Sequence, residues 1–365
     1  IMTELQRLAA LAPDWNWARC AVIAREWSLL QPVRSYCERE GIPVQRADED
    51  TLPLWRLRET QALLDWLRHD DRKVVDTTTT LAWIAAQSPN PWWSLLAEAV
   101  QAHVLETAGA ALPVQHLMDW LADWGRQIRR RQSGLLLATA HRAKGLEFDH
   151  VAVLDGGWDR TGAQEDGDAS RRLYYVAMTR ARQTLTLARM EGRTHRFLDD
   201  LPPSGALQWR EPAILPPPAP ELAWRHEPLT LADVDLGYAG RQAADHAIHA
   251  AIAALQPGDP LSLTVQSGQR LLRDGQGRII GKRARTYRPP VGMECCSARV
   301  AAVLVRREED CDELYRGHLR CPRWEVVVPE LIFAPAADHV PSRPGPHERL
   351  ATRSPTSRPM VPAGR

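Results

Sequence analysis

The stretch GLLLATAHRAKGLEFDHVAVLDGG, residues 134–157, is the part of this chain most diagnostic of its architecture. Two apolar runs, at 135–137 and 150–154, flank a short segment rich in small and charged residues. Residues 170–179 then show the apolar spacing of a helix, and residues 184–187 alternate like a strand. Because strands that alternate with helices build parallel sheets, we predict an α/β fold.

A second unit of this kind lies near the beginning of the sequence. The apolar run at 21–24 predicts a strand, and residues 33–39 predict a helix that ends at Gly41. We therefore expect residues 1–51 and 133–201 to contribute to one domain with a single parallel sheet.

Residues 52–132 are predicted to form a helical insertion within that domain. They contain seven of the fourteen tryptophans of the chain. Tryptophans at this density either anchor the packing of helices or stack against nucleic-acid bases, and we favour the packing role.

The second half of the chain is separated from the first by proline. Seven prolines fall within nineteen positions, which predicts a stiff linker over residues 202–224. Short apolar runs separated by turns then predict a small α+β or β-rich accessory module over residues 225–335, with strands near 261–265, 300–305 and 325–328. The final segment, 336–365, holds six prolines and five arginines and few apolar residues, which predicts disorder.

The composition excludes several classes of protein. Lysine and arginine total 46 and aspartate and glutamate 45, so binding of a polyanion must depend on local charge.

No signal peptide and no run of about 18 apolar residues occur, so we expect a cytoplasmic protein with no membrane partner. Six cysteines are too few for a disulfide scaffold in 365 residues. Cys295 and Cys296 are adjacent, and Cys311 and Cys321 also lack the spacing of zinc ligands, so we expect no metal site.

The segment 139–148 follows the carboxyl end of a predicted strand, where open α/β sheets bind ligands. Small Ala143 and flexible Gly145 permit a tight turn in this segment. The charged side chains of the segment are then expected to converge on one crevice. A carboxylate such as Glu147 can accept hydrogen bonds from a sugar hydroxyl, and the cations can hold phosphate.

Arg180 follows the predicted helix at 170–179, near its C-terminus, where the helix dipole favours a cation. An arginine in this position suits a γ-phosphate, because its planar guanidinium stays charged and bridges developing negative charge. Taken alone, the pattern also fits arginines on a solvated helix face.

Together the two segments resemble motifs V and VI of superfamily-one helicases of the UvrD, Rep and PcrA type. The strings TAHRAKGLEF (139–148) and RRLYYVAMTRA (171–181) are similar to the family patterns T-L-H-x-A-K-G-L-E-F and R-R-L-x-Y-V-x-x-T-R-A, in the same order. CAVIAREW (20–27) and GIPV (41–44) are similar to motif IV. The resemblance implies the second RecA-like domain of such a motor, with a reduced version of the family's helical 2B subdomain over 52–132.

The resemblance implies an ATP side and a DNA side. On the ATP side, Arg25 and Arg180 would reach the γ-phosphate as catalytic arginines, and Gly145 and Glu147 would bind ATP, with Glu147 accepting from the ribose. The implied cofactor is ATP with Mg²⁺, and the implied activity is that of an ATP-dependent DNA helicase.

On the DNA side, the resemblance implies that Thr139, His141 and Arg142 contact single-stranded DNA. Such contacts to the phosphate backbone grip the strand without reading its sequence.

The 365 residues contain no G-x-x-x-x-G-K-[ST] loop, and no Asp-Glu pair follows an apolar strand directly. The chain is therefore expected to supply half of an ATP site and to need an upstream RecA-like domain, in cis or in trans. The alternative is a catalytically inactive nucleic-acid-binding or regulatory protein that retains the helicase fold.

A basic cluster stands out in the accessory module. Residues 270–288 hold seven basic side chains and one acidic side chain. On a hairpin these would form a stripe for a phosphate backbone, with Lys282, Arg283 and Arg285 as DNA contacts. The alternative is a solvated face.

Overall fold

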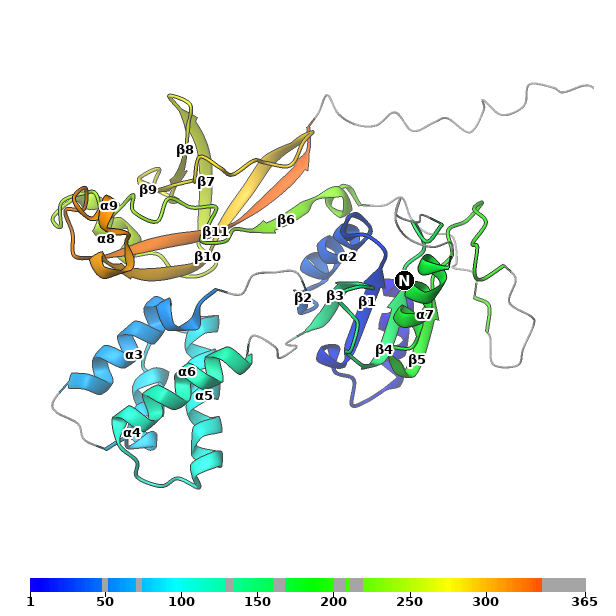
Figure 1. Ribbon diagram of the computed structural model, residues 1–365, viewed down its shortest axis with the longest axis horizontal. Helices are drawn as coiled ribbons and strands as arrows, with labels where there is room; N and C mark the ends of the chain where they lie inside the picture. The colour runs from blue at the N-terminus through cyan, green and yellow to red at the C-terminus, as the bar shows by residue number, and fades with distance from the viewer. Residues whose placement is uncertain are drawn as a thin grey trace, which may run out of the picture.

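The computed structural model describes residues 1–47, 52–69, 74–128, 134–159, 168–199, 208–210 and 219–336. Figure 1 shows a parallel sheet flanked by helices, a group of helices in cyan, and a sheet of long antiparallel strands. Most of the predicted linker 202–224 and of the predicted tail 336–365 lies outside the described residues.

Five parallel strands form the first sheet in the order β2-β3-β1-β4-β5. They are β1 (Cys20–Ala24), β2 (Val44–Arg46), β3 (Leu135–Thr139), β4 (Phe148–Val153) and β5 (Ala181–Leu187). Every residue of β1 and β3 is buried, so these interior strands are nearly continuous apolar runs. The predicted fold class, an α/β parallel sheet built from both segments, is confirmed.

Helices cover both faces of this sheet (Figure 1). On one face, α1 (Met2–Leu11) and α2 (Trp27–Glu40) bury residues such as Leu5 and Leu30 against β1 and β3. On the other face, α7 (Ala169–Met178) buries Tyr174 and Ala177. α2 ends at Gly41, whose φ of 65° lies in the left-handed region that favours glycine.

The helical insertion consists of α3 (Arg58–Arg68), α4 (Thr77–Ala85), α5 (Pro91–Thr107) and α6 (Val114–Ile128). The Asn90 side chain caps α5 by accepting from the backbone N–H groups of Trp92 and Trp93, and Pro91 occupies the first turn. Tryptophans hold these helices together: the rings of Trp66 and Trp83 stack with centroids 4.9 Å apart. This arrangement agrees with the packing role and leaves the stacked faces within the protein.

Six antiparallel strands form the second sheet in the order β6-β11-β10-β7-β8-β9. They are β6 (Arg225–Pro228), β7 (Pro260–Gln266), β8 (Gln269–Arg273), β9 (Ile279–Lys282), β10 (Met293–Arg307) and β11 (Arg323–Pro335). Two helices, α8 (Ala247–Ala253) and α9 (Glu313–Arg316), and four 3-10 turns complete the described elements: η1 (Trp17–Arg19), η2 (Leu54–Arg56), η4 (Pro220–Ala223) and η5 (Glu308–Asp310). β10 and β11 are much longer than the predicted strands at 300–305 and 325–328. The prediction was too short because charged residues such as Arg299 and Glu330, which pair across the two strands, interrupt the apolar pattern of the sequence.

The helical insertion and the accessory module share a hydrophobic core. Leu304 of β10 and Val328 of β11 belong to the same buried cluster as Leu63 and Leu96 of the insertion. The neighbouring Val303 faces the opposite way, into a cluster that includes α8. The long hairpin is therefore packed on both faces, and the division into a separate insertion at 52–132 and module at 225–335 does not describe how the chain buries its apolar surface.

Within the described residues, no helix has the length and apolar character needed to cross a bilayer.

Candidate functional site

The segment 140–147 does not form one crevice; it passes from one edge of the parallel sheet to the other. Ala140 follows the carboxyl end of β3, where its N–H donates to the carbonyl of Ala24. Glu147 immediately precedes the amino end of β4. Because β3 and β4 run parallel to β1, these ends lie at opposite edges, roughly 17 Å apart for strands of this length at about 3.3 Å per residue. Gly145, with a φ of 84° and open space around its Cα, permits the chain to turn within this crossing.

Arg180 and Glu147 meet at the amino edge of the sheet. Arg180 ends the turn between α7 and β5, and its carbonyl accepts from the N–H of Phe148. Its guanidinium donates to the carbonyls of Val176 (2.8 Å) and Leu146 (3.1 Å) and to the hydroxyl of Thr179 (3.0 Å). Arg180 therefore links the two helicase-like segments directly.

Glu147 lies beside this arginine and is paired with Arg182 at 2.7 Å. Both side chains are more than half exposed, so water screens the pair and its contribution to stability is small. The carboxylate can exchange this partner for a ligand hydroxyl at little cost.

A second group of charged side chains lies at the carboxyl edge. The Arg25 guanidinium is 2.8 Å from Nε2 of His141, which joins the end of β1 to the turn after β3. Because guanidinium only donates, this imidazole nitrogen accepts, and the neutral ring carries its proton on Nδ1. Arg142 and Lys144 are exposed in the same turn, and neither side chain has a hydrogen bond or ion pair within the described part of the chain. Thr139 is 9% exposed, and its carbonyl accepts from the N–H of Ala143 to close the turn.

The expectation that Arg25 and Arg180 reach the same γ-phosphate does not agree with this geometry. Arg25 follows the carboxyl end of β1, whereas Arg180 precedes the amino end of β5. The strands are parallel, so the whole length of the sheet separates the two residues. The sequence places both beside strands, but only the strand direction and register show at which edge each lies.

The basic cluster of the accessory module, residues 270–288, does not form a continuous exposed surface of unpaired side chains. Arg283 is 2% exposed and lies over the ring of Tyr287, so its predicted role as a surface contact for DNA is wrong. Arg278 pairs with Asp274 at 2.6 Å, and Arg273 donates to the carbonyl of Gly277. Lys282 and Arg285 of the predicted contacts remain at least partly exposed.

Sequence reasoning missed a buried ionic network between α2 and the second sheet. Arg34 pairs with Glu38 (2.9 Å) and Glu330 (3.1 Å), and Arg299 pairs with the same two carboxylates at 3.2 and 2.5 Å. These residues are up to 296 positions apart, so no local pattern could reveal the network.

Glu38, His226 and Glu330 bring three ligand-type atoms within 4.8 Å of one another. Arg34 and Arg299 already neutralise both carboxylates, so a cation at this point would have to displace two guanidinium groups. Burial lowers the pKa of His226, which keeps the imidazole neutral.

The segment that crosses the sheet lies within the part of the chain that is similar to known proteins. Residues 134–188, which contain β3, β4, α7 and β5, match the UvrD-like helicase C-terminal domain. The chain is also 40% identical over 103 residues to the ATP-dependent DNA helicase UvrD1 of Mycobacterium leprae (strain TN). This part of the chain is similar to the C-terminal portion of UvrD-type superfamily-one helicases. The match covers 23% of the chain and 13% of the mycobacterial helicase.

The UvrD-like segment thus includes both residues that meet at the amino edge, Glu147 and Arg180, and the turn that carries His141 and Arg142. Arg25 and the whole second sheet lie outside the family match.

Proposed function

We propose that this chain is the second RecA-like half of an ATP-dependent DNA helicase or translocase, with an attached accessory module. The observation that supports this proposal is the contact of Arg180 with the Leu146 carbonyl, next to Glu147, because it joins the two family motifs at one edge of the sheet. The opposite edge carries the exposed cations of the turn after β3.

Arg180 would act at the amino edge as the arginine that stabilises charge on the γ-phosphate. Its three hydrogen bonds go to two carbonyls and one hydroxyl, all neutral acceptors. An anionic phosphate is a stronger acceptor for guanidinium than these groups, so the side chain can exchange them for the nucleotide. Glu147 would accept from the ribose, and Gly145 would permit the turn that presents it.

ATP and Mg²⁺ fit this edge only in part. It offers cationic and hydrogen-bonding groups but none of the phosphate-cradling loop, which the 365 residues do not contain. A first RecA-like domain, in the same polypeptide or in trans, would hold the triphosphate and the metal ion.

His141 and Arg142 would contact single-stranded DNA at the carboxyl edge. Thr139 would support them, because its carbonyl closes the turn by accepting from the N–H of Ala143. Arg25, which is bonded to His141, belongs to this edge in our proposal and not to the ATP side. Separate edges for nucleotide and strand would let a change at one be transmitted through the segment 140–147 to the other.

The first test is Arg180→Ala in this chain combined with a first RecA-like domain. Loss of an arginine that stabilises the transition state lowers turnover by about 10³–10⁵-fold, so we expect DNA-stimulated ATP hydrolysis to disappear. Binding of single-stranded DNA should be almost unchanged, because Arg180 lies at the other edge. Arg171→Ala, an exposed arginine of the same helix, is the matched control and should hydrolyse ATP at a rate near that of the unmodified protein.

The second candidate is a nucleic-acid-binding or regulatory protein without catalysis that retains the helicase fold. An unchanged ATPase rate in Arg180→Ala, or no ATPase with any first RecA-like domain while DNA binding persists, would support this candidate. Arginine-dependent ATP hydrolysis by the 365 residues alone would contradict the need for a partner domain.

A further inference from the structure

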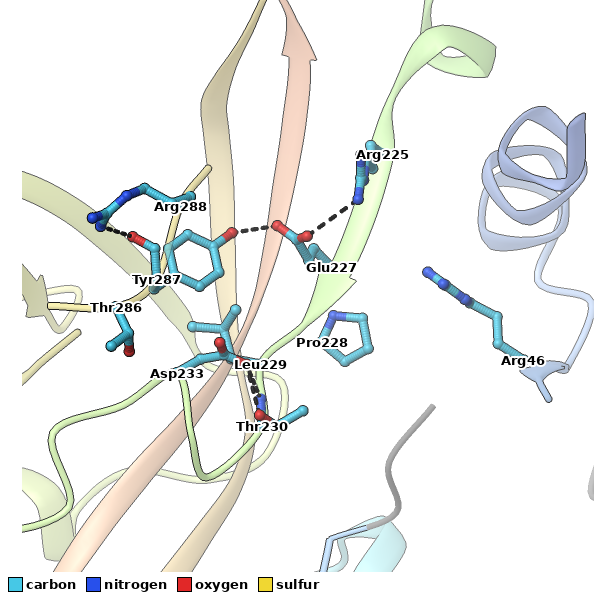
Figure 2. Close-up of a pocket in the computed structure, with 10 residues that line it drawn as sticks. All are labelled: Arg46, Arg225, Glu227, Pro228, Leu229, Thr230, Asp233, Thr286, Tyr287 and Arg288. Atoms are coloured by element: carbon cyan, nitrogen blue, oxygen red, sulfur yellow. Dashed lines mark hydrogen bonds and ion pairs between the residues drawn. The ribbon is translucent and has the colours of Figure 1, made fainter. Parts of the chain in front are cut away.

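A cavity of about 340 Å³ lies between the parallel sheet and the antiparallel sheet. Arg46, the last residue of β2, borders it from the first sheet, and Arg225 of β6 and Arg288 border it from the second. Figure 2 shows Arg46 extending toward β6, with Arg225 above and Arg288 beside the ring of Tyr287. Three arginines from three distant segments therefore line one space, and the Arg288 guanidinium donates to the carbonyls of Arg285 and Tyr287.

The acidic groups of the cavity are already engaged. Glu227 accepts from the hydroxyl of Tyr287 and lies 3.4 Å from Arg225. Asp233 accepts from the N–H and the hydroxyl of Thr230, at 2.9 and 2.7 Å (Figure 2). Burial raises the pKa of Glu227 above the ordinary value of a glutamate.

A buried cation behind the wall adds to the positive charge. Arg283 lies against the Tyr287 ring, and its three guanidinium nitrogens have no hydrogen-bond partner within the described residues. The Nε of Arg225 is buried and has no partner within the same residues, while its Nη2 pairs with Glu227. Because an unpaired buried cation such as Arg283 is costly, an anion in the adjacent cavity would offset part of this cost.

The cavity also lies on the edge that the proposed function assigns to DNA. Arg46 ends β2 two positions before the level of Thr139, since it pairs with Leu137 of β3. Neighbouring strands lie about 4.8 Å apart, so Arg46 is roughly two strand spacings from Arg25 along the same carboxyl edge. A single strand of DNA that contacts His141 and Arg142 would reach Arg46 next.

We propose that this cavity binds a phosphate group through Arg46, Arg225 and Arg288. Guanidinium groups bind phosphate oxygens through paired N–H donors, and several arginines lining one cavity suit an anion with several equivalent oxygens better than a planar carboxylate. The position beside the carboxyl edge favours a backbone phosphate of single-stranded DNA, an assignment that rests on the proposed function. A free phosphate ligand has the same chemistry.

The test uses the double variant Arg225→Gln/Arg288→Gln of the full chain. Binding of a labelled single-stranded oligonucleotide is measured by fluorescence anisotropy at several salt concentrations, and binding of inorganic phosphate by calorimetry. We expect DNA affinity at low salt to fall by about tenfold or more, and the slope of log K against log salt to decrease by about 0.7 for each phosphate that the variant no longer neutralises. Arg320→Gln, an exposed arginine of the same module, is the matched control and should leave both measurements unchanged.

The two probes distinguish a strand from a free ligand. A variant that loses inorganic phosphate but keeps DNA affinity supports the phosphate site and assigns it to a free ligand. A variant that keeps both affinities, or an unmodified chain that binds neither probe, overturns the proposal. If the double variant fails to fold, Arg288→Gln alone, at an exposed position, provides the same comparison.

A parallel variant, His141→Ala/Arg142→Gln, separates this proposal from the proposed function. Unchanged DNA binding in that variant would remove the proposed strand path along the carboxyl edge. A loss of phosphate binding in Arg225→Gln/Arg288→Gln would still support the cavity.

Discussion

At the scale of single residues, burial determines whether a basic side chain is available to bind a phosphate. Arg283 belongs to a cluster that looks like a phosphate-binding stripe in the sequence, yet it is 2% exposed and its nitrogens are unpaired within the described residues. Desolvation lowers its pKa to about 10, which expresses the same cost in another form. Arg285, two positions along the chain, is exposed to solvent.

We predict that Arg283→Met raises the free energy of unfolding of the unliganded protein by about 1 kcal/mol or more. An apolar side chain of similar length removes the desolvation cost of the buried cation, on the order of several kcal/mol, which we expect to exceed the cation–π energy of about 2 kcal/mol from Tyr287. Chemical denaturation checks this, with Arg285→Met as the control expected within about 0.5 kcal/mol of the unmodified protein. A clear loss of stability in Arg283→Met would mean that the ring contact outweighs desolvation.

At the scale of elements, helix ends and strand ends determine where function can lie. The parallel strands place Arg180 and Arg25 at opposite edges, and a cap determines where α5 begins. Asn90 serves two elements, because its Oδ1 caps α5 while its Nδ2 donates to the buried Glu59 of α3 at 3.0 Å.

Asn90→Ala is expected to lower the free energy of unfolding by about 2 kcal/mol. The cap alone contributes about 1 kcal/mol, and the buried Glu59 carboxylate would also lose its donor. Denaturation of the variant measures the sum, and Ser88→Ala, exposed on the preceding turn, should change the stability by less than about 0.5 kcal/mol. A cost as small as that of the control would exclude the coupling to Glu59.

At the scale of the whole molecule, the two sheets are joined by charge as well as by apolar packing. His226 of β6 is 5% exposed and faces Glu38 and Glu330, with Arg34 and Arg299 on the same network. Burial is the largest influence and lowers the pKa of His226 despite the nearby carboxylates. The contact between sheets therefore favours the neutral imidazole.

This direction predicts that stability falls as the pH drops below about 6.5, the pKa of an unburied histidine. In that range the unfolded chain binds a proton that folded His226 does not, so the free energy of unfolding decreases by at most about 1.4 kcal/mol per pH unit for this group. His103 and His150, whose pKa values burial also lowers, add slopes of the same sign.

Unfolding curves between about pH 7.5 and 5.5, a range that spans this pKa, test the prediction. His226→Gln should flatten the dependence, while His318→Gln, at an exposed position, should leave it unchanged. An identical slope in His226→Gln would show that the histidine titrates equally in both states.

The parallel α/β pattern can be read from the sequence alone, because buried strands of such a sheet must be apolar runs such as those at 20–24 and 135–139. The similarity of residues 134–188 to UvrD-type helicases can be read in the same way, since the two motifs are contiguous strings that need no folding to be recognised. The turns at Gly41 and Gly145 could also be predicted from the sequence, and both glycines have positive φ.

Which of these residues share an edge depends on the three-dimensional fold. Strand direction separates Arg25 from Arg180, burial removes Arg283 from the surface, and Leu304 joins the insertion to the second sheet. Arg46, Arg225 and Arg288 meet across more than two hundred positions of sequence. Such contacts depend on the register and packing of distant elements, and local propensity carries no information about either.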